Sequence, residues 1–122
     1  AMNALGLPGV YFRPIVYKPF YGRDQGKTLR GVQIHLYDFD KVDLMPLQFY
    51  FMQVHQELYP EKDIFGVSEN RWNMFDKVNG SDQVRLEFSR EYQVKPLLEQ
   101  WRSQAKAFQQ ESISFWLYPA ND

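Results

Sequence analysis

The chain has 122 residues, of which 44% are hydrophobic and 24% are charged, and both values fit one globular domain with a single core. A net charge of −1 and the lack of any run of Lys or Arg argue against nucleic acid as a partner. The absence of cysteine excludes disulfides and thiol chemistry, and no apolar stretch approaches the roughly 18 to 20 residues of a membrane-spanning helix.

The ends of the chain differ in character from its middle. Residues 1–9 include Leu5-Gly6-Leu7-Pro8-Gly9, a turn-rich run that is typical of a lead-in from a preceding domain or of the beginning of a polypeptide. We therefore predict a single domain over residues 10–119 with a short tail at residues 120–122.

Two strands are predicted in the first third of the chain. Residues 10–17 are rich in β-branched and aromatic types, and Pro14 within them favours an edge position or a bulge. Residues 31–38 alternate strictly between apolar and polar side chains, and a loop over residues 18–29 joins the two segments. A third strand is predicted over residues 113–118, which alternate again and are followed by Pro119.

Three helices are predicted between these strands. Apolar residues recur at helical spacing over residues 47–58, with Pro46 at the start and Pro60 after the end. Ser81 is a predicted N-cap of a short helix that ends near Phe88, and Pro96 begins a longer helix. Residues 61–73 are predicted as a loop that covers Phe65 and Trp72. The order β, β, α, α, α, β predicts an α+β fold, in which a small mixed sheet of about three or more strands carries helices on one face.

Alternation divides the predicted strands into two faces. Val32, Ile34 and Leu36 lie on an apolar face that the helices would cover, whereas Gln33 and His35 lie on the other. The residues predicted on this second face are Tyr11, Arg13, Tyr17, Gln33, His35, Tyr37, Trp116 and Tyr118. Such residue types are common in protein interfaces and sugar-binding surfaces. Three interpretations remain open: a half-solvated face or one covered by the 18–29 loop, a docking face for a partner domain, or a ligand-binding face.

Isolated polar residues give weaker signals for chemistry. His35 could act as an acid–base group, although no nucleophile or carboxylate is fixed beside it by spacing. Asp38, Asp40 and Asp43 fit turn positions better than a metal site. His55 has no partner at i+4, and no catalytic, metal or cofactor motif is present. The sequence therefore predicts no catalytic residue, no metal and no cofactor.

Several short motifs, taken together in order, resemble one protein family. They are Leu7–Pro14, Gly31–His35, Leu58–Pro60, Phe75–Asp82, Trp101, Phe108 and Leu117–Pro119. This set is similar to the C-terminal domain of the bacterial exo-β-N-acetylmuramidases (NamZ-like), formerly a domain of unknown function. The sequence departs from the family pattern at Thr28–Gly31, where small glycine-rich residues often precede Val-Gln-Ile-His, and the helix entry at Asp43–Pro46 is longer.

The resemblance implies a function for a larger parent protein. Family members have an N-terminal Rossmann-like domain, thought to hold the catalytic carboxylate, and a C-terminal domain that helps to form the cleft. The implied reaction is release of terminal N-acetylmuramic acid from peptidoglycan, which places the protein in the periplasm or outside the cell. Glycoside hydrolysis needs a positioned pair of groups, so we expect the isolated domain to be inactive.

The resemblance also implies roles for particular residues. Arg13, Gln33 and His35 match the family motifs and become the predicted cleft or interdomain residues, with Tyr11, Tyr17, Tyr37 and Trp116 beside them. The expected partners are the N-terminal catalytic domain and a peptidoglycan-derived glycan. The alternative is a non-catalytic module that uses the same face for glycan binding or dimerisation.

Overall fold

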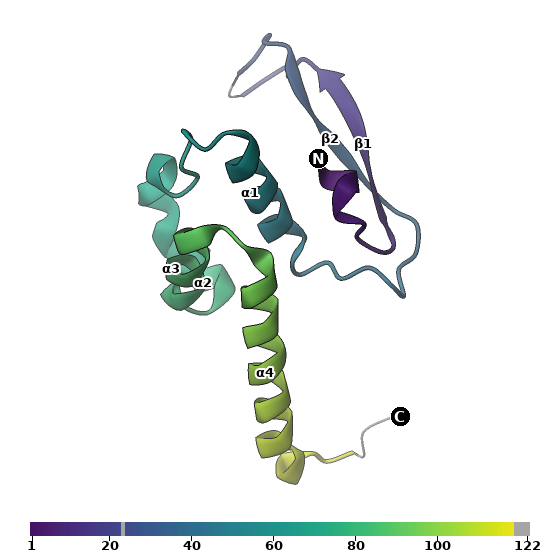
Figure 1. The fold of residues 1–122 in the computed structure, drawn as a ribbon, viewed down its shortest axis with the longest axis vertical. Helices are drawn as coiled ribbons and strands as arrows, with labels where there is room; N and C mark the ends of the chain where they lie inside the picture. Colours follow the sequence, from purple (N-terminus) through teal and green to yellow (C-terminus); the bar gives the residue numbers. More distant parts are fainter. Residues whose placement is uncertain (23, 119–122) are drawn as a thin grey trace. The chain divides into compact units, whose positions relative to one another are not determined.

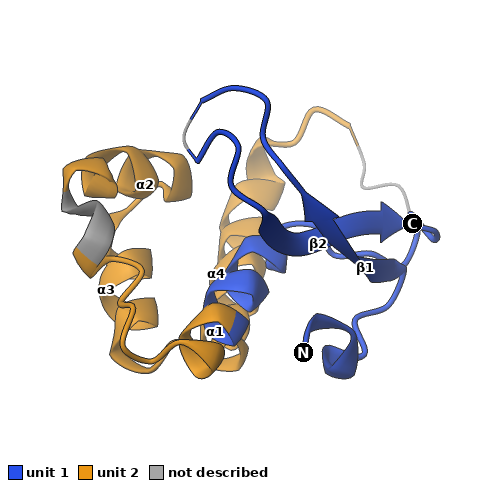
Figure 2. Ribbon diagram, turned by 90° about the horizontal axis from the view of Figure 1, so that it is seen from above, with its two compact units in different colours: residues 1–54 blue, residues 55–122 orange. Residues whose placement is uncertain are grey.

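A computed structural model describes residues 1–22 and 24–118, apart from the side chains of residues 67–69. Contacts divide the chain into two compact units, residues 1–54 and residues 55–122 (Figure 2). The predicted tail at residues 120–122 and Pro119 lie outside the described residues. The elements in chain order are η1 (Met2–Leu5), β1 (Val10–Tyr17), β2 (Leu29–Leu36), α1 (Leu47–Leu58), η2 (Gly66–Arg71), α2 (Trp72–Asn79), α3 (Asp82–Glu91), α4 (Val94–Ser112) and η3 (Ile113–Phe115) (Figure 1).

The first unit is built around an antiparallel hairpin of β1 and β2, in which Val10 pairs with Leu36 and Tyr17 pairs with Leu29. The prediction of β1 over residues 10–17 is confirmed. The predicted second strand is displaced by two residues. The N–H groups of Tyr37 and Asp38 both donate to the carbonyl oxygen of Gly9, and this shared acceptor ends the ladder. At the other end, pairing continues to Leu29 because β1 extends to Tyr17.

The outer edge of β1 is closed by a side chain. The Asn3 amide donates to the Phe12 carbonyl and accepts from the Phe12 N–H, both at 2.9 Å, as a neighbouring strand would. The N–H and C=O groups of Phe12 point away from β2. Because this direction alternates along a strand, the backbone groups of Pro14, two residues further along, point away from β2 as well. The missing N–H of Pro14 therefore costs no ladder bond, and the predicted edge position is confirmed.

The core of the first unit lies against the even-numbered face of the hairpin. Val10 and Phe12 are buried with Met2 of η1 and with Leu47 and Val54 of α1. The Phe12 ring also meets the Phe51 ring edge-on, with 5.5 Å between centroids. Burying each of these large side chains stabilises the fold by about 1.5–3 kcal/mol. The predicted helix over residues 47–58 is therefore confirmed, and the predicted apolar face is covered at Val10, Phe12, Val32 and Leu36, while Val16 and Ile34 remain exposed.

The second unit contains two helices that the sequence analysis did not predict, of which η2 lies within the predicted loop over residues 61–73 and α2 begins at its end. η2 and α2 occupy residues 66–79, where a loop was expected up to residue 73. No residue of α2 is fully buried, but Trp72 and Phe75 lie half-buried at helical spacing. Phe65 is buried, and the Trp72 indole N–H donates to its carbonyl oxygen at 2.9 Å. The expectation that Phe65 and Trp72 pack beneath this segment is confirmed.

Hydrogen bonds among Asp63, Phe65 and Tyr92 connect the segment before η2 to the end of α3. Tyr92, in the left-handed region at φ 52°, donates its hydroxyl to the Asp63 carboxylate and stacks on Phe65. That carboxylate also accepts the Phe65 N–H at 3.1 Å. The hydroxyl of Tyr92 is the main cause that lowers the pKa of Asp63, while burial and the carboxylate raise the pKa of Tyr92 to about 12.

The two predicted C-terminal helices are present with small shifts. Ser81 caps α3 by accepting the Gln83 N–H, as predicted, and α3 continues to Glu91. α4 begins at Val94, so Pro96 lies in the first turn, where a helix needs no N–H donor.

The predicted third strand over residues 113–118 is not formed. Residues Ile113–Phe115 are a 3-10 helix that continues from α4. The N–H of Ile113 donates to Gln109, and that of Trp116 donates to Ile113, so these backbone groups are satisfied locally. An α+β architecture is confirmed, but the sheet in the described part of the chain has two strands rather than three.

Candidate functional site

Six of the seven predicted site residues lie together on one face of the hairpin. Cross-strand partners share a face, and the register pairs Tyr11 with His35 and Arg13 with Gln33. Tyr17 and Tyr37 have the same parity at the two ends of the hairpin. We call this set, Tyr11, Arg13, Tyr17, Gln33, His35 and Tyr37, the odd face. Trp116 is not part of it, since this residue follows η3 in the second unit and donates its indole N–H to Ser112.

A direct hydrogen bond orders the centre of the odd face. Arg13 Nη2 donates to Gln33 Oε1 at 2.7 Å. The bond uses one of the five donors of the guanidinium, so the others remain available to a ligand. Arg13, Gln33 and His35 are all exposed. The arrangement can supply positive charge, an amide and an imidazole to one bound group.

The aromatic residues of the odd face are open to solvent. Tyr11 is 50% exposed and Tyr37 is 69% exposed. Tyr17, next to the 18–29 loop, is 48% exposed, so the described part of this loop does not cover the face, and its own Phe20 and Tyr21 are also exposed. Tyrosines with a free ring face and a free hydroxyl suit contact with a sugar or a protein.

A hollow adjoins one end of the odd face. It has a volume of about 290 Å³, and Tyr11 and Tyr37 line it together with Asn3 and Pro8. Asn3 is held there by its two bonds to Phe12. The sequence analysis missed this hollow because residues 1–9 carry no periodic pattern that would predict their packing beside β1.

The other candidate residues have structural roles or stand alone. Asp38 forms a 2.8 Å ion pair with Lys41 in a turn, and no group of residues in the described parts of the chain could hold a metal ion. Asp38 begins this turn, because its carbonyl oxygen accepts the N–H groups of Lys41 and Val42. His55 Nδ1 is buried without a hydrogen-bond partner among the described residues, and the ring lies 5.3 Å from the Tyr59 ring.

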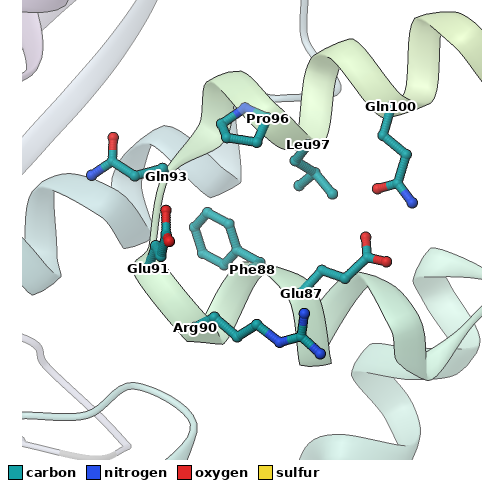
Figure 3. A pocket seen from close by; sticks show the side chains of 8 residues that line it. All are labelled: Glu87, Phe88, Arg90, Glu91, Gln93, Pro96, Leu97 and Gln100. Atoms are coloured by element: carbon teal, nitrogen blue, oxygen red, sulfur yellow. The ribbon is translucent and has the colours of Figure 1, made fainter.

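A second hollow lies between α3 and α4, with a volume of about 300 Å³. Figure 3 shows Phe88, Pro96 and Leu97 along its apolar floor, while charged and amide side chains form the rim. The rim residues are Glu87, Arg90, Glu91, Gln93 and Gln100. Since none of these polar side chains is buried, the hollow offers no preorganised catalytic pair.

Fold and site together define a class of protein. In its described parts the chain has an α+β fold with an exposed polar and aromatic face, and it lacks a helix long and apolar enough to cross a membrane. The family model described as exo-beta-N-acetylmuramidase NamZ, C-terminal, matches residues 1–118, and the chain belongs to this family. The resemblance seen in the sequence motifs is thereby confirmed.

Two relatives place the chain within longer proteins. The peptidoglycan beta-N-acetylmuramidase NamZ of Bacillus subtilis (strain 168) is 26% identical over 117 residues, which are 96% of this chain and 27% of that protein. A crystal structure of a DUF1343 family protein from Bacteroides fragilis NCTC 9343 superposes with a TM-score of 0.83 at 39% identity, over 97% of this chain and 31% of that one. The chain thus spans less than a third of the length of either relative.

Proposed function

We propose that this chain is the accessory domain of a peptidoglycan-processing glycosidase that releases terminal N-acetylmuramic acid. In this proposal the odd face helps to form the cleft beside an N-terminal catalytic domain. Family membership and the name of the Bacillus subtilis relative support the substrate class. The observation that carries the role of the face is the alignment of Arg13, Gln33 and His35 on one open surface.

The chemistry of the odd face suits an acidic sugar. N-acetylmuramic acid carries a carboxylate, which the guanidinium of Arg13 could bind through charge-assisted hydrogen bonds. The Arg13–Gln33 bond holds the guanidinium in one orientation, so less side-chain freedom is lost on binding. Tyr11 and Tyr37 supply ring faces beside the neighbouring hollow.

The proposal gives no catalytic residue to this chain. A glycosidase uses an acid and a base or nucleophile held about 5–10 Å apart, and the odd face carries no carboxylate. We therefore expect the 122-residue chain alone to release no product from a chromogenic muramic-acid glycoside. Turnover by the purified chain above that of a buffer control would contradict this division of labour.

A titration tests the role of the face directly. N-acetylmuramic acid is added to the longer parent protein, and NMR chemical-shift changes are recorded at the amides of β1 and β2. We expect the largest changes at Arg13, Gln33 and His35, with small changes at Val32 and Ile34 on the opposite face. Changes confined to other parts of the protein would argue against a cleft role for the hairpin.

A second function, in a different class, follows from the exposed aromatic residues. Tyr37 is 69% exposed and Phe20 is 88% exposed, values that would also fit a non-catalytic module for glycan binding or dimerisation. Sedimentation distinguishes the two. A dimer that Tyr37→Ala dissociates would favour the module, whereas a monomer that binds no glycan alone would favour the accessory role.

The proposal also gives a location. Peptidoglycan lies outside the cytoplasmic membrane, so we place the parent protein in the periplasm or outside the cell. Fractionation of cells that produce a tagged parent would test this placement.

A further inference from the structure

The C-terminal half of α4 carries an apolar stripe that its own unit leaves uncovered. Val94, Leu97, Trp101, Ala105 and Phe108 follow one another at spacings of three or four residues, which places them on one side of the helix. Val94 is fully buried and Leu97 is 4% exposed, but Phe108, further along the same stripe, is 71% exposed. Burial therefore stops partway along a stripe that continues in the sequence.

The residues beyond α4 continue the same pattern. Phe115 is 81% exposed and Leu117 is 90% exposed. From Arg102 to Glu111 every residue of α4 is exposed, and Figure 1 shows this half of the helix extending away from α2 and α3. We call residues 101–118 the α4 arm.

The apolar side chains in the helical part of the arm are gathered on one side of α4, where Trp101, Ala105 and Phe108 lie. Between residues 101 and 112 only Arg102, Lys106 and Glu111 carry charge, and none of the three lies on the stripe. A half-helix of this length would also fray without a packing partner.

We infer that the α4 arm docks on the N-terminal domain of the longer parent protein and holds the two domains together. The inference rests on the proposed function, in which this chain is an accessory domain. The partner of the arm is inferred from the length of the relatives. The relatives that match nearly the whole chain are more than three times as long as it is. The arm's 18 residues approach the roughly 20–30 residues that each side of a stable interface contributes.

This inference separates two roles that the sequence analysis left together. The arm provides the docking surface, so the odd face is left for the glycan. Each role then depends on different residues, and each can fail without the other.

Hydrogen exchange of the longer parent, without glycan, tests the docking. The informative variant is Phe108→Glu. The matched control is Gln110→Glu, which introduces the same charge on the opposite side of α4, two residues away. We expect amides 102–112 to be protected in the wild type and in Gln110→Glu, and to exchange roughly tenfold faster or more in Phe108→Glu, while α3 is unchanged.

Other outcomes would overturn the inference. Rapid exchange of the arm in the wild-type parent would show that nothing covers it. Equal effects of the two variants would show that charge alone, rather than the stripe, matters. If sedimentation shows that arm protection appears only in a dimer of the parent, a second copy rather than the N-terminal domain is the occupant. None of these readouts depends on glycan binding, so they leave the proposed role of the odd face to its own titration.

Discussion

Gly9 is the residue whose replacement should damage the hairpin most directly. Its φ is +73°, a region that costs an L-residue roughly 1–2 kcal/mol. A Cβ at this position would overlap the carbonyl oxygen of Asp38 and lie 2.9 Å from the N of Val42. Both are backbone atoms of the turn that follows β2. The N–H groups of Tyr37 and Asp38 bond the Gly9 carbonyl oxygen, so this turn cannot move away without breaking the end of the ladder. Such overlap adds about 1–3 kcal/mol.

Gly6 offers a matched control in the same segment. Its φ is +63°, but a Cβ there would meet nothing within 4 Å. We therefore expect Gly6→Ala to lower the free energy of unfolding by about 1–2 kcal/mol from backbone strain alone. Gly9→Ala should lower it by about 2–5 kcal/mol, the sum of strain and overlap.

Urea unfolding, monitored through hydrogen exchange of the β1 and β2 amides, measures the difference in unfolding free energy between the two variants. The amide readout is needed because all three Trp residues lie in the second unit and do not report on the hairpin. Equal destabilisation by the two substitutions would refute the argument that close packing of the turn, rather than positive φ, makes glycine necessary at this position.

Three further changes have defined outcomes. Tyr92→Phe keeps the ring but removes the hydroxyl that bonds Asp63, so we expect a loss of about 1 kcal/mol at pH 7 in urea unfolding. Because the folded-state pKa of Asp63 is lowered, this difference should be present above about pH 4 and shrink as pH falls through the folded pKa; a loss that is independent of pH would contradict the link. In the wild type, the raised pKa of Tyr92 predicts stability that declines between about pH 10 and 12, which Tyr92→Phe should abolish. Asn3→Ala removes both bonds to Phe12 and should cost about 1–3 kcal/mol, seen as faster exchange of the Phe12 amide; unchanged exchange would show that this amide is protected in another way. Ser81→Ala removes the α3 cap and should cost about 0.5–2 kcal/mol in thermal unfolding, while Ser81→Asp should retain most of the stability.

Elements with a strong local pattern could be predicted from the sequence. β1 has alternating side chains and α1 is bounded by prolines, and both were predicted with the observed limits. The limits of the second strand could not be predicted, because they depend on a tertiary contact. The Gly9 carbonyl oxygen accepts the N–H groups of both Tyr37 and Asp38, and this ends the strand pairing. The grouping of Arg13, Gln33 and His35 on one face nevertheless followed from alternation alone, since parity survives a shift of the strand ends.

The sequence analysis missed elements whose secondary structure depends on contacts with the rest of the fold. α2 has only eight residues, so the helical spacing of Trp72 and Phe75 is too short a pattern to identify a helix by itself. Residues 113–118 alternate as a strand would, yet alternation creates a strand only where another strand offers hydrogen bonds. In the described structure the backbone continues as a 3-10 helix to Phe115 instead, and Phe115 and Leu117 are exposed.

The central claim is that the odd face contacts the glycan, and kcat/KM of the longer parent for a muramic-acid glycoside tests it most directly. Arg13→Ala is compared with Arg30→Ala, which removes the same type of side chain from the opposite face of the same hairpin. We expect Arg13→Ala to lower kcat/KM roughly 10- to 100-fold, because a hydrogen bond to a charged group contributes about 1.5–3 kcal/mol. We expect Arg30→Ala to leave it within about twofold. Equal activity of the two variants would contradict the account.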